Sequence, residues 1–178
     1  MYIKIKQDFL NPVCDDWFKF KSEELTSSYQ SGTVLLEYRK IANKLLFKSQ
    51  HTRNPFKIPP DYIRFSEIHG RGILLPHRDH GVKTGLNYYI SADNDITTFY
   101  KTKSDKVVSI KYPNRKESNI YTQNDLIETD RFVASSNEAY LLDVSQIHSV
   151  QRVNPESRVF IGYLWANHSY EEVLESLE

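Results

Sequence analysis

A histidine and an aspartate two residues apart, His77 and Asp79, lie between the apolar runs Gly72 to Leu75 and Gly85 to Ile90. In an extended chain, side chains two positions apart project to the same side, so these two can bind one metal ion together. Two protein ligands are too few for a catalytic ion. We expect the third to be His148, which follows another β-prone segment far downstream. The spacing therefore predicts a metal site made of two histidines and one carboxylate.

Taken alone, a His-x-Asp pair is a weak signal, because about one chance match arises in every few sequences of this kind. The competing interpretation of His77 and Asp79 is a polar turn between two strands. The segment after the pair nevertheless alternates in the way expected of a strand that lines a site, with Gly85, Asn87 and Tyr89 on one face. This alternation favours the metal site over the turn.

Arg158 begins an apolar run ten residues after His148. We expect two adjacent antiparallel strands to bring both side chains into one cavity. A buried arginine needs an anionic partner, because its unpaired charge is costly. That partner is either Asp143 or Glu156, in a structural salt bridge, or a dicarboxylate cosubstrate held by two parallel hydrogen bonds. With open positions opposite them, two histidines and a carboxylate are the ligand set of non-haem Fe(II) oxygenases.

Many short β-prone runs follow one another at intervals of about ten residues, which is typical of a sandwich or a barrel. We expect strands at Tyr2–Ile5, Tyr62–Ile68, Gly72–His77, Gly85–Ile90, Ile96–Lys101, Val107–Tyr112, Asn119–Thr122, Leu126–Val133, Tyr140–Asp143, Ile147–Gln151 and Arg158–Trp165.

Helices are expected at both ends of this β core. Apolar residues at a 3.6-residue period predict a helix over Thr33–Phe47, and a weaker helical pattern covers Asp15–Leu25. Ser169 and Glu172 have the spacing of a capping box for a short C-terminal helix over residues 169–178. We therefore expect one domain over residues 1–178: a helical region 1–60, a β core 62–165 and the C-terminal helix.

The composition excludes several classes of function. Charged residues make up 26% of the 178 residues and balance to zero, so nothing global steers the protein to nucleic acid or to an anionic membrane. Cys14 is the single cysteine, which excludes an internal disulfide and fits a reducing compartment. No apolar stretch has the length of a membrane span, and the first residues lack the pattern of a signal peptide. We expect a cytoplasmic protein with no membrane partner.

The order His77-x-Asp79, His148, Arg158 resembles the Fe(II)- and 2-oxoglutarate-dependent oxygenases over about residues 62–165. Tyr88-Tyr89-Ile90 and the following turn resemble the corresponding segment of prolyl hydroxylases. The resemblance implies a double-stranded β-helix (a jelly roll, as in cupins), Fe(II) held by the two histidines and Asp79, and use of 2-oxoglutarate and dioxygen. Tyr89 and Arg158 would bind the far carboxylate of 2-oxoglutarate, with Asn87 on the same face.

The implied reaction is hydroxylation of an unactivated C–H bond in a protein, peptide or small molecule, with a prolyl side chain as the first choice. The spacing from Asp79 to His148 is long for this family, and we ascribe it to a hairpin inserted around residues 102–125. His80 adjoins the motif, but in extended structure it faces away from Asp79.

Three other functions stay open. The first is a cupin-like metal enzyme without redox chemistry, such as an epimerase or isomerase, which would need no clamp at Arg158. The second is a non-catalytic jelly-roll binding module in which Arg158 pairs internally. The third, a nucleic-acid demethylase of the oxygenase superfamily, is disfavoured by the zero net charge.

Overall fold

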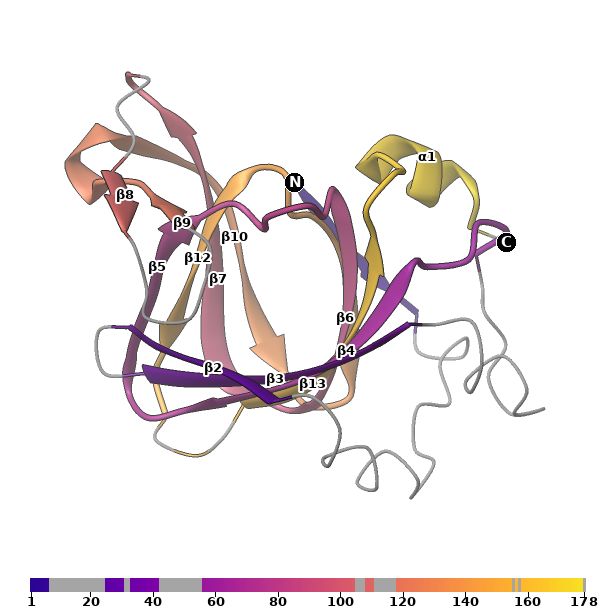
Figure 1. The fold of residues 1–178 in the computed structure, drawn as a ribbon, viewed down its shortest axis with the longest axis horizontal. Helices are drawn as coiled ribbons and strands as arrows, with labels where there is room; N and C mark the ends of the chain where they lie inside the picture. The colour runs from indigo at the N-terminus through magenta and orange to yellow at the C-terminus, as the bar shows by residue number, and fades with distance from the viewer. Residues whose placement is uncertain are drawn as a thin grey trace.

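Runs rich in β-branched and aromatic residues form strands through most of the chain. The computed structural model describes residues 1–6, 25–30, 33–41, 56–104, 108–110, 118–154, 156 and 158–177. Its strands form two antiparallel sheets that face each other (Figure 1). In spatial order, the first sheet contains β1 (Tyr2–Ile5), β11 (Glu138–Asp143), β6 (Thr84–Ser91), β13 (Arg158–Trp165), β4 (Tyr62–His69), β3 (Thr33–Ile41) and β2 (Leu25–Gln30). The second contains β10 (Leu126–Ser135), β7 (Asp93–Thr102), β12 (Ile147–Arg152), β5 (Gly72–His77), β9 (Ser118–Ile120) and β8 (Val108–Ile110).

The strand order is that of a jelly roll. Counted along the chain without the β8–β9 hairpin, successive strands from β4 to β13 alternate between the sheets, except that β7 and β10 lie in the same sheet. In one sheet the order of neighbours is β4, β13, β6 and β11, which are the first, eighth, third and sixth strands. In the other sheet the order is β10, β7, β12 and β5, which are the fifth, fourth, seventh and second. This connectivity is the double-sheet jelly roll that cupins also have. The expected mainly-β, cupin-like fold is confirmed.

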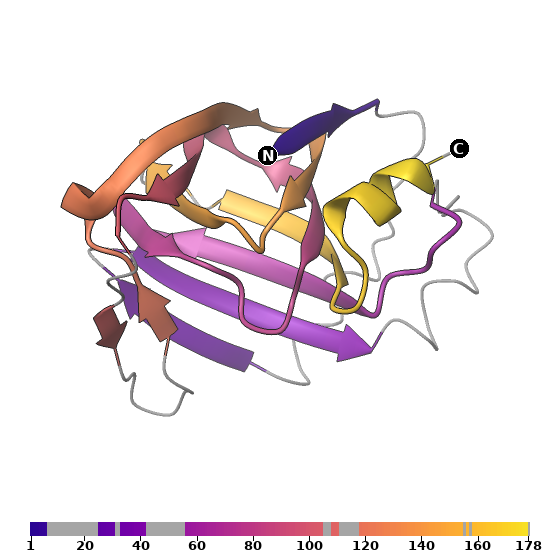
Figure 2. The ribbon, with the colours of Figure 1, turned by 90° about the horizontal axis from the view of Figure 1, so that it is seen from above.

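The period-two alternation of β6 divides the core into two layers. Tyr89 faces the space between the sheets, where it packs with Phe99, Phe132 and Phe160. Tyr88 faces the other way, into a second cluster that is completed by the residues Leu86, Trp165, Tyr170 and Val173. Helix α1 (Tyr170–Glu175) lies outside the barrel beside the first sheet (Figure 2). The first sheet is therefore buried on both faces where the helix covers it.

Helix α1 confirms the C-terminal prediction. The Ser169 hydroxyl accepts a hydrogen bond from the Glu172 amide, and the Glu172 carboxylate accepts one from the Ser169 amide, so the capping box is complete. No helix in the described part of the chain is long and apolar enough to cross a membrane.

The helix predicted over Thr33–Phe47 is wrong where the structure describes it, and α1 is the only α-helix among the described residues. Residues Thr33–Ile41 form strand β3, which pairs with β2 on one side and with β4 on the other. The segment Thr-Val-Leu-Leu-Glu-Tyr-Arg-Lys-Ile contains β-branched and aromatic residues that suit a strand as well as a helix, and pairing on both sides decides between them. Residues 42–47 and 15–24 lie outside the described residues, and Leu25 begins β2.

The hairpin expected around residues 102–125 is present as β8 and β9, which pair antiparallel. It extends the second sheet, because Ile120 of β9 is the register partner of His77 on β5. The Tyr121 amide also donates to the Pro76 carbonyl at 3.0 Å. The inserted hairpin therefore lies beside the strand that carries the predicted metal ligand His77.

Candidate metal centre

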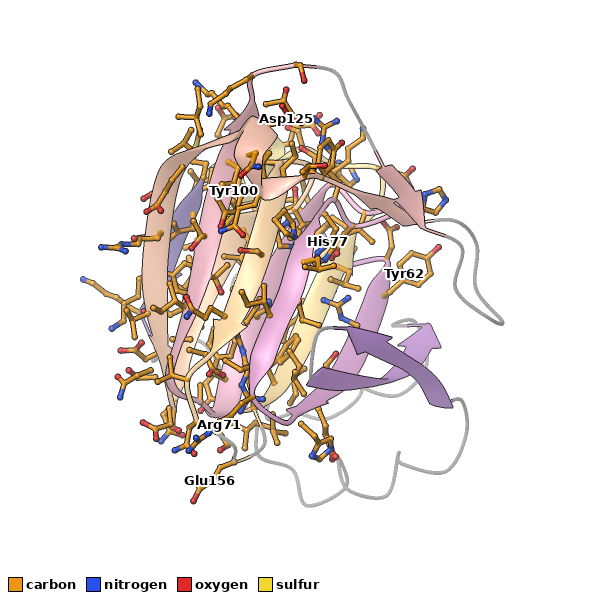
Figure 3. All side chains as sticks on the ribbon, turned by 90° about the vertical axis from the view of Figure 1, so that its left-hand side faces the viewer. Tyr62, Arg71, His77, Tyr100, Asp125 and Glu156 are labelled. Carbon is orange, nitrogen blue, oxygen red and sulfur yellow. The ribbon has the colours of Figure 1, made fainter. Side chains whose placement is uncertain are left out.

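His77 and His148 lie opposite each other on neighbouring strands. His77 ends β5 and His148 is the second residue of β12; the two are register partners, and their ring centroids are 4.6 Å apart. Figure 3 shows His77 near the same end of the barrel as Tyr62 and Tyr100, with Arg71 and Glu156 at the other end. Antiparallel pairing thus brings together two histidines that are far apart in the sequence.

Both histidine rings present the same nitrogen to the site. The Nδ1 atom of His77 is 2.6 Å from the Leu75 carbonyl, and that of His148 is 3.0 Å from the Gln146 carbonyl. Because a carbonyl can only accept, each Nδ1 carries the hydrogen and each neutral ring keeps a lone pair on Nε2. A backbone partner on the remote nitrogen is the usual support of a metal-binding histidine.

Asp79 supplies the third ligand atom. Its amide donates to the Val144 carbonyl at 3.2 Å, which ties it to the turn before β12. Its Oδ1 is 3.5 Å from Nε2 of His77 and 3.8 Å from Nε2 of His148. The ligand atoms of these three residues all lie within 4.8 Å of one another. The expected set of two histidines and one carboxylate is therefore assembled.

The surroundings of the site keep the Asp79 carboxylate ionised and shift the pKa values of the two histidines in opposite directions. Burial raises the pKa of Asp79, but the hydrogen bond from His77 and the charge of Arg64 outweigh it, so the pKa lies well below its usual range. Burial lowers the pKa of His77, but bonding to Asp79 and its charge produce a net rise. Burial and the neighbouring His77 lower the pKa of His148 to about 4. In the metal-free site, His77 is thus the histidine that takes up a proton first.

These three residues open into a pocket between the two sheets. Its other polar lining consists of Arg64, Asn87, Tyr89, Thr97 and Arg158, and its apolar lining consists of Ile68, Leu74, Leu142, Val144, Val150 and Phe160. Of the candidate metal ligands, both histidines come from the second sheet and Asp79 follows its strand β5, whereas both arginines, Asn87 and Tyr89 come from the first sheet. The site is therefore formed across the interior of the barrel.

Arg158 lies inside this pocket with few partners. Its side chain is 2% exposed, and its guanidinium carbon is 4.4 Å from the centroid of the Tyr89 ring. Nη2 lies 3.5 Å from the Thr97 hydroxyl, but Nε and Nη1 have no hydrogen-bond acceptor within the described residues. The buried Tyr89 hydroxyl and the Asn87 amide oxygen likewise lack a partner there. The Arg158 nitrogens and the Tyr89 hydroxyl are unmet donors, which are expected of an anion-binding site, whereas the Asn87 amide oxygen can only accept.

The nearest acid to Arg158 is neither of the two that the sequence suggested. Asp143 instead accepts hydrogen bonds from Ser145 and from Gln146. Glu156 is exposed, and its backbone carbonyl accepts from a different arginine, Arg152. The expectation of adjacent strands is also wrong, because β12 and β13 belong to opposite sheets.

Asp95 is the buried carboxylate near Arg158, at 4.0 Å from Nη1, but it belongs to Arg152. Nε of Arg152 is 2.8 and 3.0 Å from its two oxygens, and the Val153 amide donates to it as well. Arg152 also donates to the carbonyls of Ile68, Asn154 and Glu156. One carboxylate therefore faces two buried arginines, and a net positive charge is left in the pocket beside Arg158.

Two buried charged residues were missed in the sequence: Arg64, which lines the pocket, and Asp95, which lies 4.0 Å from Nη1 of Arg158. Arg64 interrupts the β-prone run Tyr62–Ile68, but no local pattern shows that this strand faces Asp79. Asp95 lies just before the expected strand Ile96–Lys101, and no local pattern distinguishes it from Asp93. His80 is exposed and lies outside the group of ligand atoms, as expected.

No family model matches this chain, and no curated protein is significantly similar to it in sequence. Solved structures similar to it include the R92A mutant of Bacillus subtilis oxalate decarboxylase, with a TM-score of 0.45 and 12% identity over 84% of this chain and 30% of that one. Vicilin from Corylus avellana (hazelnut) has a TM-score of 0.46 and 9% identity over 84% of this chain and 32% of that one. CapF with the inhibitor 3-isopropenyl-tropolone has a TM-score of 0.41 and 12% identity over 80% of this chain and 30% of that one.

The chain thus spans about a third of the length of each of these proteins. Its fold follows from its own strand order, and its function has to be argued from its own site.

Proposed function

We propose that this protein is an Fe(II)- and 2-oxoglutarate-dependent oxygenase that hydroxylates an unactivated C–H bond. The observation that carries the proposal is Arg158. A buried cation with unmet donors lies in the same pocket as two histidines and a carboxylate, and it needs an anion that the described residues do not fully supply. A dicarboxylate that binds the metal through one end and Arg158 through the other meets both requirements.

The donor set fits Fe(II). Two neutral imidazole nitrogens and one carboxylate oxygen on one side of an ion, with open positions opposite, suit the non-haem iron of oxygenases. Both imidazoles have the backbone support that such ligands need. When bound, the iron would supply the activation of dioxygen, which no protein side chain can perform.

The chain's own residues bind and orient the cosubstrate. Arg158 would pair with its far carboxylate, with the Tyr89 and Thr97 hydroxyls as further donors and Asn87 on the same wall. The ring of Tyr89 holds the guanidinium in place through a cation–π contact. Leu74, Leu142 and Val150 exclude water around the pair, which strengthens the charge interaction.

For the substrate, we propose only a chemical class. A peptidyl side chain, with proline first, is proposed from the sequence resemblance to prolyl hydroxylases, and a free small molecule is the alternative. A cytoplasmic location belongs to the same proposal.

A second function is favoured by Asp95. Its carboxylate lies 4.0 Å from Arg158, so the cation has an internal neighbour even without a ligand. If that contact were sufficient, the pocket would be a cupin-like metal site without a 2-oxo acid, either in a non-redox enzyme or in a binding module. The two functions differ in whether 2-oxoglutarate is consumed.

Succinate release therefore tests the proposal. The full chain is incubated with Fe(II), 2-oxoglutarate and air, with and without peptide pools, and succinate is quantified. We expect slow uncoupled release that is lost in His148→Ala and in Arg158→Gln. Release that persists in His148→Ala would reveal a contaminant. Metal binding without any succinate would favour the second function.

A further inference from the structure

The wall of the pocket nearest the metal ligands contains a second buried arginine, Arg64. It lies on β4, which belongs to the sheet opposite the two histidines, and it is 8% exposed. Its Nη1 is 3.7 Å from Oδ2 of Asp79, and its guanidinium carbon is 5.7 Å from the centroid of the Phe160 ring. Arg64 therefore contacts a predicted metal ligand from across the barrel.

The two oxygens of Asp79 have different neighbours. Oδ1 is the atom near both histidines, at 3.5 Å from Nε2 of His77 and 3.8 Å from Nε2 of His148. Oδ2 is the atom near Arg64. A carboxylate can bind a metal through one oxygen or through both. Here one oxygen faces the ligand group and the other faces a cation.

Gly162 lies between Arg64 and Asn87 in the first sheet, and a side chain there would meet Asn87 more closely than Arg64. On β13, Gly162 is the register partner of Arg64 on one side and of Asn87 on the other, so the three positions form a row across the sheet. A Cβ atom at Gly162 would lie 3.2 Å from Oδ1 of Asn87 and 3.5 Å from Nε of Arg64. Gly162 is not among the residues with positive φ, so it is the space that favours glycine there.

We propose that Arg64 is a positioning residue that holds Asp79 as a one-oxygen metal ligand and so keeps a further coordination position open. Its charge occupies Oδ2, while Oδ1 stays directed toward the histidines. The inference rests on the metal-binding part of the proposed function and is independent of whether the open positions take a 2-oxo acid.

The test measures how Asp79 binds a metal. The full chain, labelled with carboxyl-¹³C aspartate, is loaded with Mn(II) alone, and the infrared difference between metal-bound and metal-free protein is recorded. The gap between the antisymmetric and symmetric carboxylate stretches is wide for one-oxygen binding and narrow for two-oxygen binding. We expect a wide gap in the wild type and in Arg64→Lys, and a narrow gap in Arg64→Met.

Arg78→Met is the matched control. Arg78 lies between the two ligands His77 and Asp79, but it is exposed and its guanidinium carbon is 5.6 Å from the centroid of the Tyr121 ring. This variant also removes one positive charge near the metal, and we expect it to keep the wide gap. A narrow gap in Arg78→Met would show that charge alone, and not the contact with Oδ2, sets the binding mode, which overturns the proposal.

Other outcomes are equally decisive. A narrow gap in the wild type, or an unchanged wide gap in folded Arg64→Met, overturns the role of Arg64 and leaves the oxygenase proposal intact. If Arg64→Met does not fold, Arg64→Gln, which removes the charge and keeps a polar side chain, is expected to narrow the gap, and an unchanged gap there counts against the proposal. Failure of the folded wild type to bind Mn(II) would overturn both the metal site and this inference.

Discussion

Two buried arginines near one carboxylate show how residues of the same type take different roles. Arg152 and Arg158 are each 2% exposed, and both lie within 4.0 Å of Asp95. Arg152 has the carboxylate and three backbone carbonyls as acceptors, whereas Arg158 has a hydroxyl at 3.5 Å and an aromatic face. We therefore propose that Arg152 stabilises the fold and that Arg158 binds a ligand.

This assignment predicts opposite results for the same substitution. Arg158→Met should leave the free energy of unfolding nearly unchanged and weaken 2-oxoglutarate binding by roughly 2–4 kcal/mol, about 30- to 1000-fold, because a charge-assisted contact is lost. Arg152→Met should cost about 3–5 kcal/mol of stability, because the buried Asp95 keeps only the Val153 amide and the more distant Arg158 as partners. Urea unfolding and calorimetric titration measure the two effects. A destabilised Arg158→Met with normal cosubstrate affinity would assign Arg158 to the fold instead.

Metal binding should depend on pH in two steps. A metal needs both histidines neutral, and the raised pKa of His77 means that a proton competes for that ring in the metal-free site. Below the pKa of His77, the affinity for Mn(II) should fall roughly tenfold per pH unit. His148, with its pKa lowered to about 4, stays neutral until the pH approaches that value, where the slope should double. Mn(II) titrations at a series of pH values from 8 to about 4 measure both slopes. A hundredfold loss of affinity per pH unit already near neutrality would contradict the different pKa values of the two histidines.

The same shift makes His148 a source of acid instability in the metal-free protein. Its folded pKa of about 4 lies below its unfolded value of 6.5, so the unfolded chain binds more protons between these values. The free energy of unfolding should therefore fall as the pH falls from about 6.5 to about 4. His77 has the opposite sign, because its raised pKa adds stability at low pH that is lost as the pH rises through it.

The candidate ligands could be found in the sequence because their spacing follows the geometry of a strand. His77 and Asp79 share a face by the two-residue period, and His148 and Arg158 each begin a β-prone run. Partners that come from the opposite sheet, such as Arg64 and Asp95, could not be found, because no local pattern records which strands face each other.

Among the elements, β5 has the central position for the site, because β12 and β9 flank it where it ends in His77. The hairpin is anchored there by Tyr121, which is 7% exposed and packs with Leu126 and Ile147. This anchor is the point at which an inserted segment joins the core.

Removing this anchor should destabilise the protein. Tyr121→Ala should cost about 3 kcal/mol of unfolding free energy, because it deletes a large buried side chain and leaves a cavity. Tyr62→Ala is the matched control: Tyr62 is 40% exposed, and its loss should cost about 0.5 kcal/mol or less. Chemical denaturation compares them. Equal costs would show that the hairpin end is no part of the core.

Elements with clear alternation were predicted well, and the one with mixed signals was not. The bounds of β5 and β13 agree with the prediction to the residue, because turn residues or sharp polarity changes bound their apolar runs. For β3, apolar residues at helical spacing were misleading. Its two paired neighbours are distant or weakly patterned in the sequence, so the decisive interaction was not visible locally.

At the scale of the whole molecule, closing the barrel is what assembles the site. One sheet carries His77 and His148, with Asp79 directly after β5, and the other carries Arg158 and Tyr89. Neither sheet alone has both the candidate metal ligands and Arg158, the proposed anion-binding residue. The jelly roll could be expected from the number and spacing of the strands, but the distance between its two walls is a property of tertiary packing.

One measurement tests the central claim that metal and dicarboxylate meet in this pocket. Under anaerobic conditions, Fe(II) is added to the folded chain and 2-oxoglutarate is then titrated in, while the visible spectrum is recorded. We expect a weak charge-transfer band that grows with 2-oxoglutarate, saturates, and requires much higher concentrations in Arg158→Gln. Protein that binds Fe(II) but develops no such band at saturating 2-oxoglutarate would contradict the claim.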